Sequence, residues 1–365
     1  MVKSIYVHIP FCNKICAYCD FTKFLAHHKY VEPYVDTLVK HIKSYPEFQA
    51  KTIYLGGGTP SSLPLPLLNK VLEALSPFTK DIQEYTIETN VENINQELIN
   101  LLVKYGVNRI SIGVQTFNNI HLKTLNRNHT YNEIIEKINL LKSNNFNNIS
   151  IDLIYGLPNQ TIKEFREDLE IACSLPIKHL SLYSLMIEEH TLLFLQNYQE
   201  RDEDFLDECY TLACSYLKKQ GFTRYEVSNF ALSSEYESKH NLVYWNDQEY
   251  VSFGVGASGY EGNTRYTYTK SLQNYIKNYN DREEELIDIY NHKEEYIMLH
   301  LRTRYGISFL DYKHVFNEDF LSKFNKPITY LKENGYIEIN DDILKVKEDK
   351  IYILNSIIIK FIECL

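Results

Sequence analysis

Three cysteines near the amino terminus constrain this chain more than any other feature. Cys12, Cys16 and Cys19 follow the apolar run 5–10 with the spacing C-x3-C-x2-C. Clustered thiolates are soft ligands that select zinc, copper(I) or iron–sulfur clusters over hard cations. Zinc sites and simple [4Fe–4S] sites normally use four protein ligands, yet the next cysteine is Cys173. Three ligands on a four-iron cluster would leave one iron open to a substrate.

Two other interpretations of these cysteines stay open on the spacing alone. The trio would also suit buried structural thiols. A zinc site would need a histidine as its fourth ligand, and His8, His27 or His28 could supply it. The rest of the chain has to separate these interpretations.

The composition is that of a soluble globular protein with one large domain and a smaller one. The chain has 365 residues, of which 44% are hydrophobic and 24% charged, and its net charge is −10. The acidic balance argues against a nucleic-acid surface and against a polybasic membrane anchor. Seven cysteines without a secretory signal are expected to be reduced thiols, so we expect a cytoplasmic location.

Short β-rich runs alternate with helical patterns up to about residue 220. We expect strands at 4–9, 52–55, 85–88, 109–114, 150–154 and 179–185, and helices at 33–45, 64–76, 95–105, 131–145, 161–174 and 203–220. Six such repeats predict an α/β fold with a parallel sheet, either a partial barrel or a doubly wound sheet. In both folds, ligands gather at the carboxyl ends of the strands.

The chemically distinctive residues follow the predicted strands, as this rule requires. The cysteines come after the first strand and the segment GGGTP (56–60) after the second. Glu88, Gln115 with Arg127, and Asp152 belong to the next three strands. Glycines let a backbone approach a ligand closely, and a buried carboxylate needs a partner. Each position also has a structural alternative: a tight turn, a helix cap, a surface charge or an internal hydrogen bond.

The chain changes character after residue 221. A connecting α+β region, 226–292, contains the motif HNLVYW (240–245) and a loop of small residues at 253–259. That loop suits close approach to a ligand or a simple turn. The polar, charged stretch 271–290 predicts a surface helix.

The last part of the chain, 293–365, predicts a small module of its own. Two helices, the second near 315–334, precede two alternating runs, YIEIN and LKVKEDKIYIL. This order suggests a winged-helix-like module, without the basic cluster that binding to a phosphate backbone requires. We therefore expect a barrel over 1–225, the connecting region over 226–292 and this module over 293–365.

Several motifs together resemble the radical S-adenosylmethionine (SAM) superfamily. They are YVHIPFCNKICAYCDF, GGGTP, IETN, ISIGVQTF, LNRNHT, IDLIYGLP and HNLVYW, spread over nearly the whole chain. As a set they are similar to the branch that contains the oxygen-independent coproporphyrinogen III dehydrogenases (HemN) and the HemW-type heme chaperones. The resemblance implies a partial (β/α)6 barrel and a C-terminal α+β domain ending in the winged-helix-like module.

The resemblance also assigns residues to cofactors. It implies that Cys12, Cys16 and Cys19 bind a [4Fe–4S] cluster, whose open iron holds SAM and whose electron cleaves it. It implies contacts with this SAM from Tyr6, Gly57 and Glu88. The dehydrogenases bind a second SAM, and the matching positions here are Tyr18, Gly58, Thr59, Gln115, Arg127 and Asp152.

One position separates the two branches of this family. The dehydrogenases carry a further cysteine two residues after the third, and this chain has Phe21 there. The CDF ending and the HNLVYW motif resemble the HemW side, whose members bind heme and hand it to apo-proteins. The resemblance makes His240 a candidate heme ligand, because a neutral imidazole is a common axial ligand. In the alternative interpretation, His240 holds a turn while Trp245 packs in the core.

We therefore expect a heme chaperone with a [4Fe–4S] cluster, SAM and heme, and without coproporphyrinogen dehydrogenase activity or an assigned catalytic residue. The alternatives are an oxygen-independent coproporphyrinogen III dehydrogenase, which converts propionates to vinyl groups, and a zinc-stabilised binding protein. The expected partners are heme and heme-accepting apo-proteins, and nucleic acid is not among them. A homodimer and a peripheral membrane association through an acceptor stay open.

Overall fold

A sheet of nine strands organises the computed structural model, which describes residues 2–26 and 28–365, without the side chain of His28. The strand order is β11-β1-β4-β5-β6-β7-β8-β10-β9. Its centre is a parallel run of β1 (Ser4–Ile9), β4 (Thr52–Gly57), β5 (Glu84–Thr89), β6 (Arg109–Gln115), β7 (Asn148–Tyr155) and β8 (His179–Ser184). These strands are rich in buried Ile, Val and Leu, as expected where a sheet is covered on both faces.

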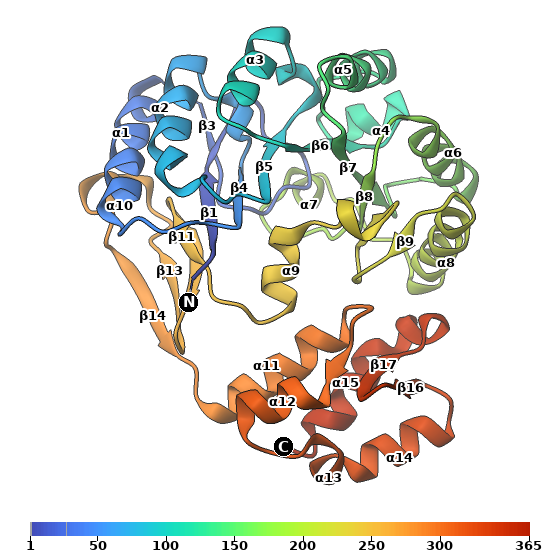
Figure 1. Ribbon diagram of the computed structural model, residues 1–365. Coiled ribbons are helices and arrows are strands. Elements are labelled where there is room, and N and C mark those ends of the chain that lie inside the picture. Colours follow the sequence, from blue (N-terminus) through green and yellow to red (C-terminus); the bar gives the residue numbers. More distant parts are fainter. Residues whose placement is uncertain (1, 27) are drawn as a thin grey trace.

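Six helices cover the outer face of this curved sheet (Figure 1). They are α1 (His28–Ser44), α2 (Leu65–Leu75), α3 (Gln96–Lys104), α5 (Tyr131–Ser143), α6 (Ile162–Ser174) and α8 (Glu203–Lys219). Their starts are encoded locally: Thr130 with Glu133, and Thr161 with Glu164, form capping boxes. The predicted α/β fold with a parallel, partial-barrel sheet is confirmed.

The connecting region adds strands to both edges of the sheet. β11 (Val251–Phe253) pairs with β1 in parallel, and β10 (Asn229–Ala231) pairs antiparallel with β8 and with β9 (Thr223–Arg224). The small-residue loop after β11 lies against β1: Gly254 has φ +115, and a Cβ there would be 2.5 Å from the His8 carbonyl oxygen. The close approach predicted for this loop is therefore to the chain itself.

The charged stretch 271–290 is not one surface helix. It forms the short α10 (Leu272–Lys277) and then β14 (Arg282–Leu286). β14 is antiparallel to β13 (Thr264–Tyr268), which also pairs with β12 (Ser258–Glu261). All five side chains of β14 are exposed, so the charges stay solvated while the backbone gains ladder hydrogen bonds.

The C-terminal domain has its own apolar core and a three-stranded sheet in the order β15-β17-β16. Its elements are α11 (Ile289–Leu301), β15 (Ile307–Ser308), α12 (Phe309–Phe316), α13 (Phe320–Lys323), α14 (Asn325–Glu333), β16 (Ile337–Asn340), β17 (Ile343–Val346) and α15 (Leu354–Ile362). The helix predicted near 315–334 is wrong as one element, because Asn317 adopts a left-handed conformation (φ 51) that ends α12. The last alternating run stops at Val346, and a 3-10 helix (Glu348–Ile353) that leads into α15 replaces its end.

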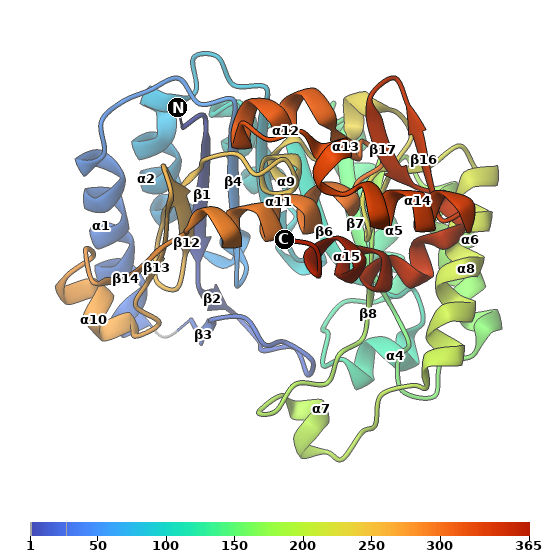
Figure 2. The same cartoon turned by 90° about the horizontal axis from the view of Figure 1, so that it is seen from below.

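This domain packs against the amino ends of the barrel strands, beside α9 (Lys239–Trp245). The Arg304 amide donates to the Tyr225 carbonyl (2.9 Å), and its guanidinium pairs with buried Glu237 (2.6 Å). His292 of α11 pairs with Asp247, just after α9 (2.5 Å). In Figure 2 the domain overlaps the upper part of the barrel, and β2 (Phe11–Cys12), β3 (Phe24–Leu25), α4 (Asn119–Thr124) and α7 (Leu192–Leu195) lie toward the lower part of the view.

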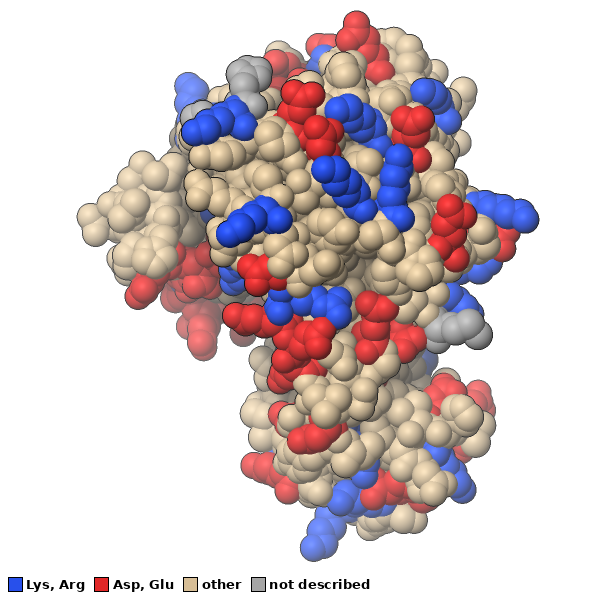
Figure 3. Space-filling view, turned by 90° about the vertical axis from the view of Figure 1, so that its left-hand side faces the viewer, with Lys and Arg blue, Asp and Glu red and all other residues tan. Residues whose placement is uncertain are grey.

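Two surface properties complete the description of the fold. Acidic and basic side chains lie interspersed on the face seen in Figure 3. Among the described residues, no helix combines the length and the apolar character needed to cross a bilayer.

Candidate cluster and cofactor site

The cysteine loop, residues 11–25, leaves the carboxyl end of β1 and is tied back to that strand. β2 and β3 pair at its base. The His8 ring bridges strand and loop: Nε2 donates to the Thr22 carbonyl (2.9 Å), and Nδ1 accepts from the Tyr6 hydroxyl (3.0 Å). Because a carbonyl can only accept, the proton of the neutral ring lies on Nε2. Both ring nitrogens of His8 are thus occupied, which leaves none to complete a zinc site.

A chain of hydrogen bonds joins two of the three cysteines. The Cys12 thiol lies 3.6 Å from the Thr59 hydroxyl, which accepts from the Asn90 amide (3.1 Å). The side-chain oxygen of Asn90, Oδ1, accepts from Nη1 of the Arg127 guanidinium (2.9 Å). The same Nη1 atom also donates to Cys16 Sγ (3.1 Å). Three strand ends and the loop therefore meet at the thiols.

The thiols have the right chemistry for an iron–sulfur cluster. Burial, with smaller contributions from the neighbouring Cys19 and Cys16, raises the pKa of Cys12 to about 11. Burial also raises the pKa of Cys19. Thiolates here would need a cationic partner, which iron provides. No three His, Cys, Asp or Glu side chains of the described ranges are gathered as a metal site. His27 and the His28 side chain, two other expected zinc ligands, lie outside those ranges.

The glycine segment forms the floor beside the loop. Gly57 has φ +113, and a Cβ there would lie 2.6 Å from the His8 ring, so only glycine fits. Its amide donates to Glu88 (3.1 Å), and the Gly58 amide donates to the Ile9 carbonyl (2.8 Å). The Thr59 amide continues this pattern onto the Phe11 carbonyl (2.9 Å).

Two half-buried carboxyl groups face the barrel interior next to this floor. Glu88 accepts from the Tyr54 hydroxyl (2.7 Å), and burial, with the charge of Asp152 adding to it, raises its pKa to about 7. Burial also raises the pKa of Asp152, which lies 3.4 Å from the Ser111 hydroxyl. A cationic ligand group would stabilise both carboxylates. The Tyr6 ring stacks on Tyr54 at 6.3 Å, in the same interior layer.

The remaining predicted positions lie around Arg127. Its Nη2 atom donates to the Gly113 carbonyl (2.5 Å) at the end of β6. Gln115 ends that strand with φ 71 at a register shift, and its amide lies close to Gly113. Tyr18 sits within the cysteine loop and packs on a small apolar cluster that includes Leu193.

Asn90, which was not among the predicted site residues, links Thr59 to Arg127 through hydrogen bonds of its side chain. It belongs to the motif IETN and directly follows β5. Its position at a strand end was the signal that could have identified it, since polar side chains at that edge converge.

The structure gives His240 a structural role, and its assignment as a heme ligand stays a prediction. The ring is 1% exposed, its Nδ1 is bonded to Thr52 Oγ1 (2.8 Å) and its Nε2 to the Tyr244 hydroxyl (2.8 Å). Both atoms that could bind iron are occupied. Thr52 begins β4 and Gly57 ends it, so His240 lies about 16 Å from the floor of the cysteine loop. His240 instead holds α9 against the sheet.

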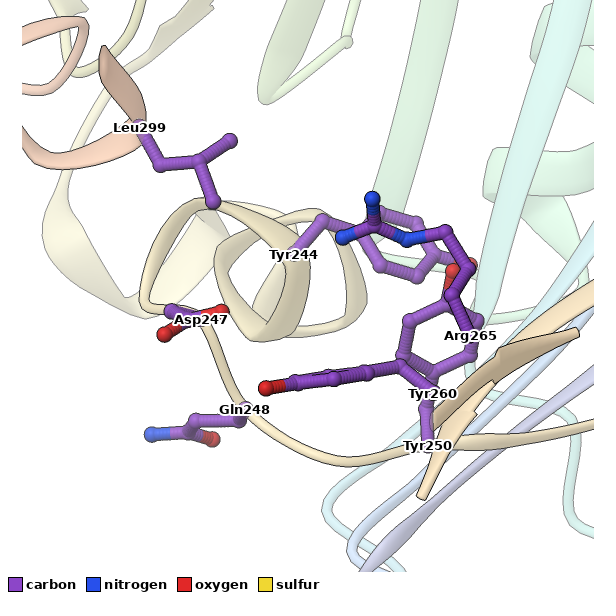
Figure 4. A pocket seen from close by; sticks show the side chains of 7 residues that line it. All are labelled: Tyr244, Asp247, Gln248, Tyr250, Tyr260, Arg265 and Leu299. Atoms are coloured by element: carbon purple, nitrogen blue, oxygen red, sulfur yellow. The ribbon is translucent and has the colours of Figure 1, made fainter. Parts of the chain in front are cut away.

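A small cavity lies at the same amino end of the strands (Figure 4). Its volume is about 190 Å³, and the lining residues are Tyr244, Asp247, Gln248, Tyr250, Tyr260, Arg265 and Leu299. Arg265 is engaged by Glu295 through two hydrogen bonds of 2.7 and 2.8 Å. The cavity is smaller than the roughly 300 Å³ of an ordinary ligand pocket, and it is remote from the cysteines.

Comparisons with known proteins agree with this geometry. The model of the radical SAM superfamily matches residues 6–172, and that of the HemN C-terminal domain matches 291–349. The solved structure of coproporphyrinogen III oxidase (HemN) from Escherichia coli is similar in fold, with a TM-score of 0.84 at 20% identity over 99% of this chain and 90% of that one. Fold and cysteine loop together define a radical SAM protein.

Curated relatives identify the branch. The heme chaperone HemW of Lactococcus lactis is 38% identical over 339 residues, 90% of this chain and 89% of the relative. The heme chaperone HemW of Bacillus subtilis is 34% identical over 354 residues, 92% and 93% of the two chains. The chain belongs to the HemW family.

Proposed function

We propose that this protein is a heme chaperone that binds heme, a [4Fe–4S] cluster and SAM, and delivers heme to acceptor apo-proteins. The observation that carries the proposal is the cysteine loop: three thiols stand at the mouth of the barrel, and Phe21, 72% exposed, occupies the place of a fourth cysteine. The relatives that match nearly the whole chain bear the name heme chaperone.

Cys12, Cys16 and Cys19 would hold the cluster. When bound, the cluster supplies an electron and an open coordination position for SAM. Arg127 would donate to the sulfur of Cys16, as it does here at 3.1 Å, and would favour the reduced cluster by offsetting its negative charge. His8 would keep the loop in register with β1 through Thr22.

The barrel interior suits the charged groups of SAM. Glu88 would accept from its ammonium group, because a carboxylate whose pKa burial has raised to about 7 is stabilised by an adjacent cation. Tyr6 and Gly57 lie beside Glu88 and would complete this contact. The positions matching a second SAM, Tyr18, Gly58, Thr59, Gln115, Arg127 and Asp152, would line the space next to it.

The test begins with protein purified and reconstituted without air. We expect iron and sulfide in equal amounts, a change in the cluster spectrum on addition of SAM, a Soret shift with heme, and transfer of that heme to an apo-protein. Cys12→Ala, Cys16→Ala and Cys19→Ala should each abolish cluster assembly. Cys173→Ala, a half-buried cysteine of α6, is the matched control and should keep it. A colourless wild type that ignores both SAM and heme would refute the proposal.

No observation favours coproporphyrinogen dehydrogenase activity. That reaction needs cationic groups free to bind substrate carboxylates at the barrel mouth. Arg127, the basic residue expected there, is already bonded to Cys16, Asn90 and the Gly113 carbonyl. An anaerobic assay for protoporphyrinogen formation should therefore be negative, and turnover would overturn this part of the proposal.

A further inference from the structure

Heme that is to be handed on needs an axial ligand that solvent can reach. Of the 12 histidines, eight have an imidazole held by a hydrogen bond or an ion pair. These are His8, His41, His121, His129, His179, His240, His292 and His300. Within the described side chains, only His190 and His314 are exposed and have no such partner. His314 is on α12 in the C-terminal domain, whereas His190 shortly precedes α7, which is hydrogen-bonded to the cysteine loop.

His190 has an unusual backbone conformation. Its φ is 74. The other non-glycine residues with positive φ in the described ranges are Gln115 and a set of Asn and Asp residues. A histidine rarely adopts the left-handed conformation and keeps it only where the surroundings impose it. Here Thr191 imposes it, because its amide and hydroxyl both donate to the Glu188 carbonyl (3.2 and 2.7 Å). The turn therefore holds His190 at the surface in one backbone conformation.

Exposed apolar side chains precede and follow this turn in the sequence of the α7 loop, residues 186–200. Met186 is 62% exposed and Leu195 65%, and Leu192 and Phe194 are also well exposed. Leu192 and Leu195 are three apart on α7 and share one face of it. A group of large apolar side chains on a surface usually marks a binding site. Here the apolar side chains share one short loop with a free imidazole, and heme requires both: apolar contact for its macrocycle and a nitrogen for its iron.

The α7 loop is fastened to the cysteine loop rather than free in solution. Its base is closed by the Ile187 amide, which donates to Glu200 (2.7 Å). The Leu193 amide donates to the carbonyl of Ala17 (2.9 Å), which stands between Cys16 and Cys19. Leu193 and Ala17 are both buried in one apolar cluster. A ligand held by the α7 loop would therefore sit beside the cluster site.

We propose that the imidazole of His190 is the axial ligand of heme iron, and that Met186, Leu192, Phe194 and Leu195 supply the apolar surface for the macrocycle. This assignment rests on the proposed heme-chaperone function and specifies its site. Glu188 and Glu189 directly precede His190, and their negative charge would disfavour a heme orientation that brings the propionates beside them. Because His190 is exposed on a surface loop, an acceptor protein could take over the heme without any unfolding of the chaperone.

The experiment compares full-length wild type with His190→Ala and His314→Ala, each titrated with ferric heme. We expect His190→Ala to lose the imidazole-ligated spectrum, to bind heme at least tenfold more weakly, and to regain the spectrum when free imidazole is added. His314→Ala, the other exposed and unpartnered histidine, should match the wild type. Both variants should unfold like the wild type, because neither side chain is buried.

Two outcomes separate the site from the function. If the wild type binds heme and His190→Ala binds it with the same spectrum and affinity, the site is wrong and the chaperone function stands. If the wild type does not bind heme, both fail. A double variant, Phe194→Ser with Leu195→Ser, should weaken binding severalfold with an unchanged spectrum, and unchanged affinity would remove the apolar part of the site.

Discussion

Replacing His240 by alanine should destabilise the fold strongly and leave heme ligation intact. The ring is 1% exposed, makes two hydrogen bonds of 2.8 Å and stacks on Tyr54 at 5.2 Å. Truncation leaves the hydroxyls of Thr52 and Tyr244 buried without this partner, at about 1 kcal/mol each. The cavity left by the ring adds about 2 kcal/mol. The free energy of unfolding should therefore fall by about 4 kcal/mol.

Urea unfolding is the appropriate assay, because the only tryptophan, Trp245, lies on the same helix and reports on α9. His314→Ala is the control and should change the unfolding free energy by less than about 0.5 kcal/mol. Heme titration of the folded His240→Ala protein should reproduce the wild-type spectrum. Normal stability together with a lost heme spectrum would refute the reasoning, since it would mean that His240 binds iron rather than α9.

Three further perturbations follow from the described contacts. Gly57→Ala places a methyl group against the His8 ring at a φ of +113, so the unfolding free energy should fall by about 3 kcal/mol and cluster assembly should be impaired. Unaltered melting would contradict this packing. The lysine of Arg127→Lys cannot reach all three acceptors of the guanidinium, which include Cys16. The free energy of unfolding should therefore fall by about 2 kcal/mol in the same urea assay. Unchanged stability would mean that these hydrogen bonds of the guanidinium are dispensable. Burial, with the charge of Arg282 second, lowers the pKa of His41 from 6.5 to about 3. Its contribution to stability is complete above pH 6.5 and is lost as the pH falls, by about 1.4 kcal/mol per unit, so His41→Gln should show a smaller decline between pH 7.5 and 5.5.

The barrel, and the edge of it that carries the cysteine loop, could be predicted because the strand patterns and the positions of the polar motifs indicate the same fold. The expected strand Ser4–Ile9 coincides with β1, and the other five central strands lie within the observed ones or within a residue of them. Buried parallel strands are near-continuous runs of Ile, Val and Tyr, which a sequence displays directly. Polar residues placed after such runs must converge, which is why the GGGTP, IETN and IDLIYGLP motifs meet in space.

The features that sequence patterns missed depend on tertiary contacts. The stretch Arg282–Leu286 has the composition of a solvated helix, and only the free edge of β13 makes it a strand. Asn317 ends α12 by a backbone conformation that composition does not reveal. For His240, the HNLVYW motif showed that an imidazole is present. It did not show that this imidazole would lie at the amino end of β4, away from the cysteine loop. His190 lies outside every motif and emerged only from its exposure and its missing partners.

The attachment of the C-terminal domain at the amino ends of the strands has a consequence for traffic through the molecule. The contacts of Arg304 with Tyr225 and of His292 with Asp247 fix that domain on the side away from the thiols. Under the proposed function, heme and a reductant would enter and leave on the side of the thiols, and the two domains would not need to separate.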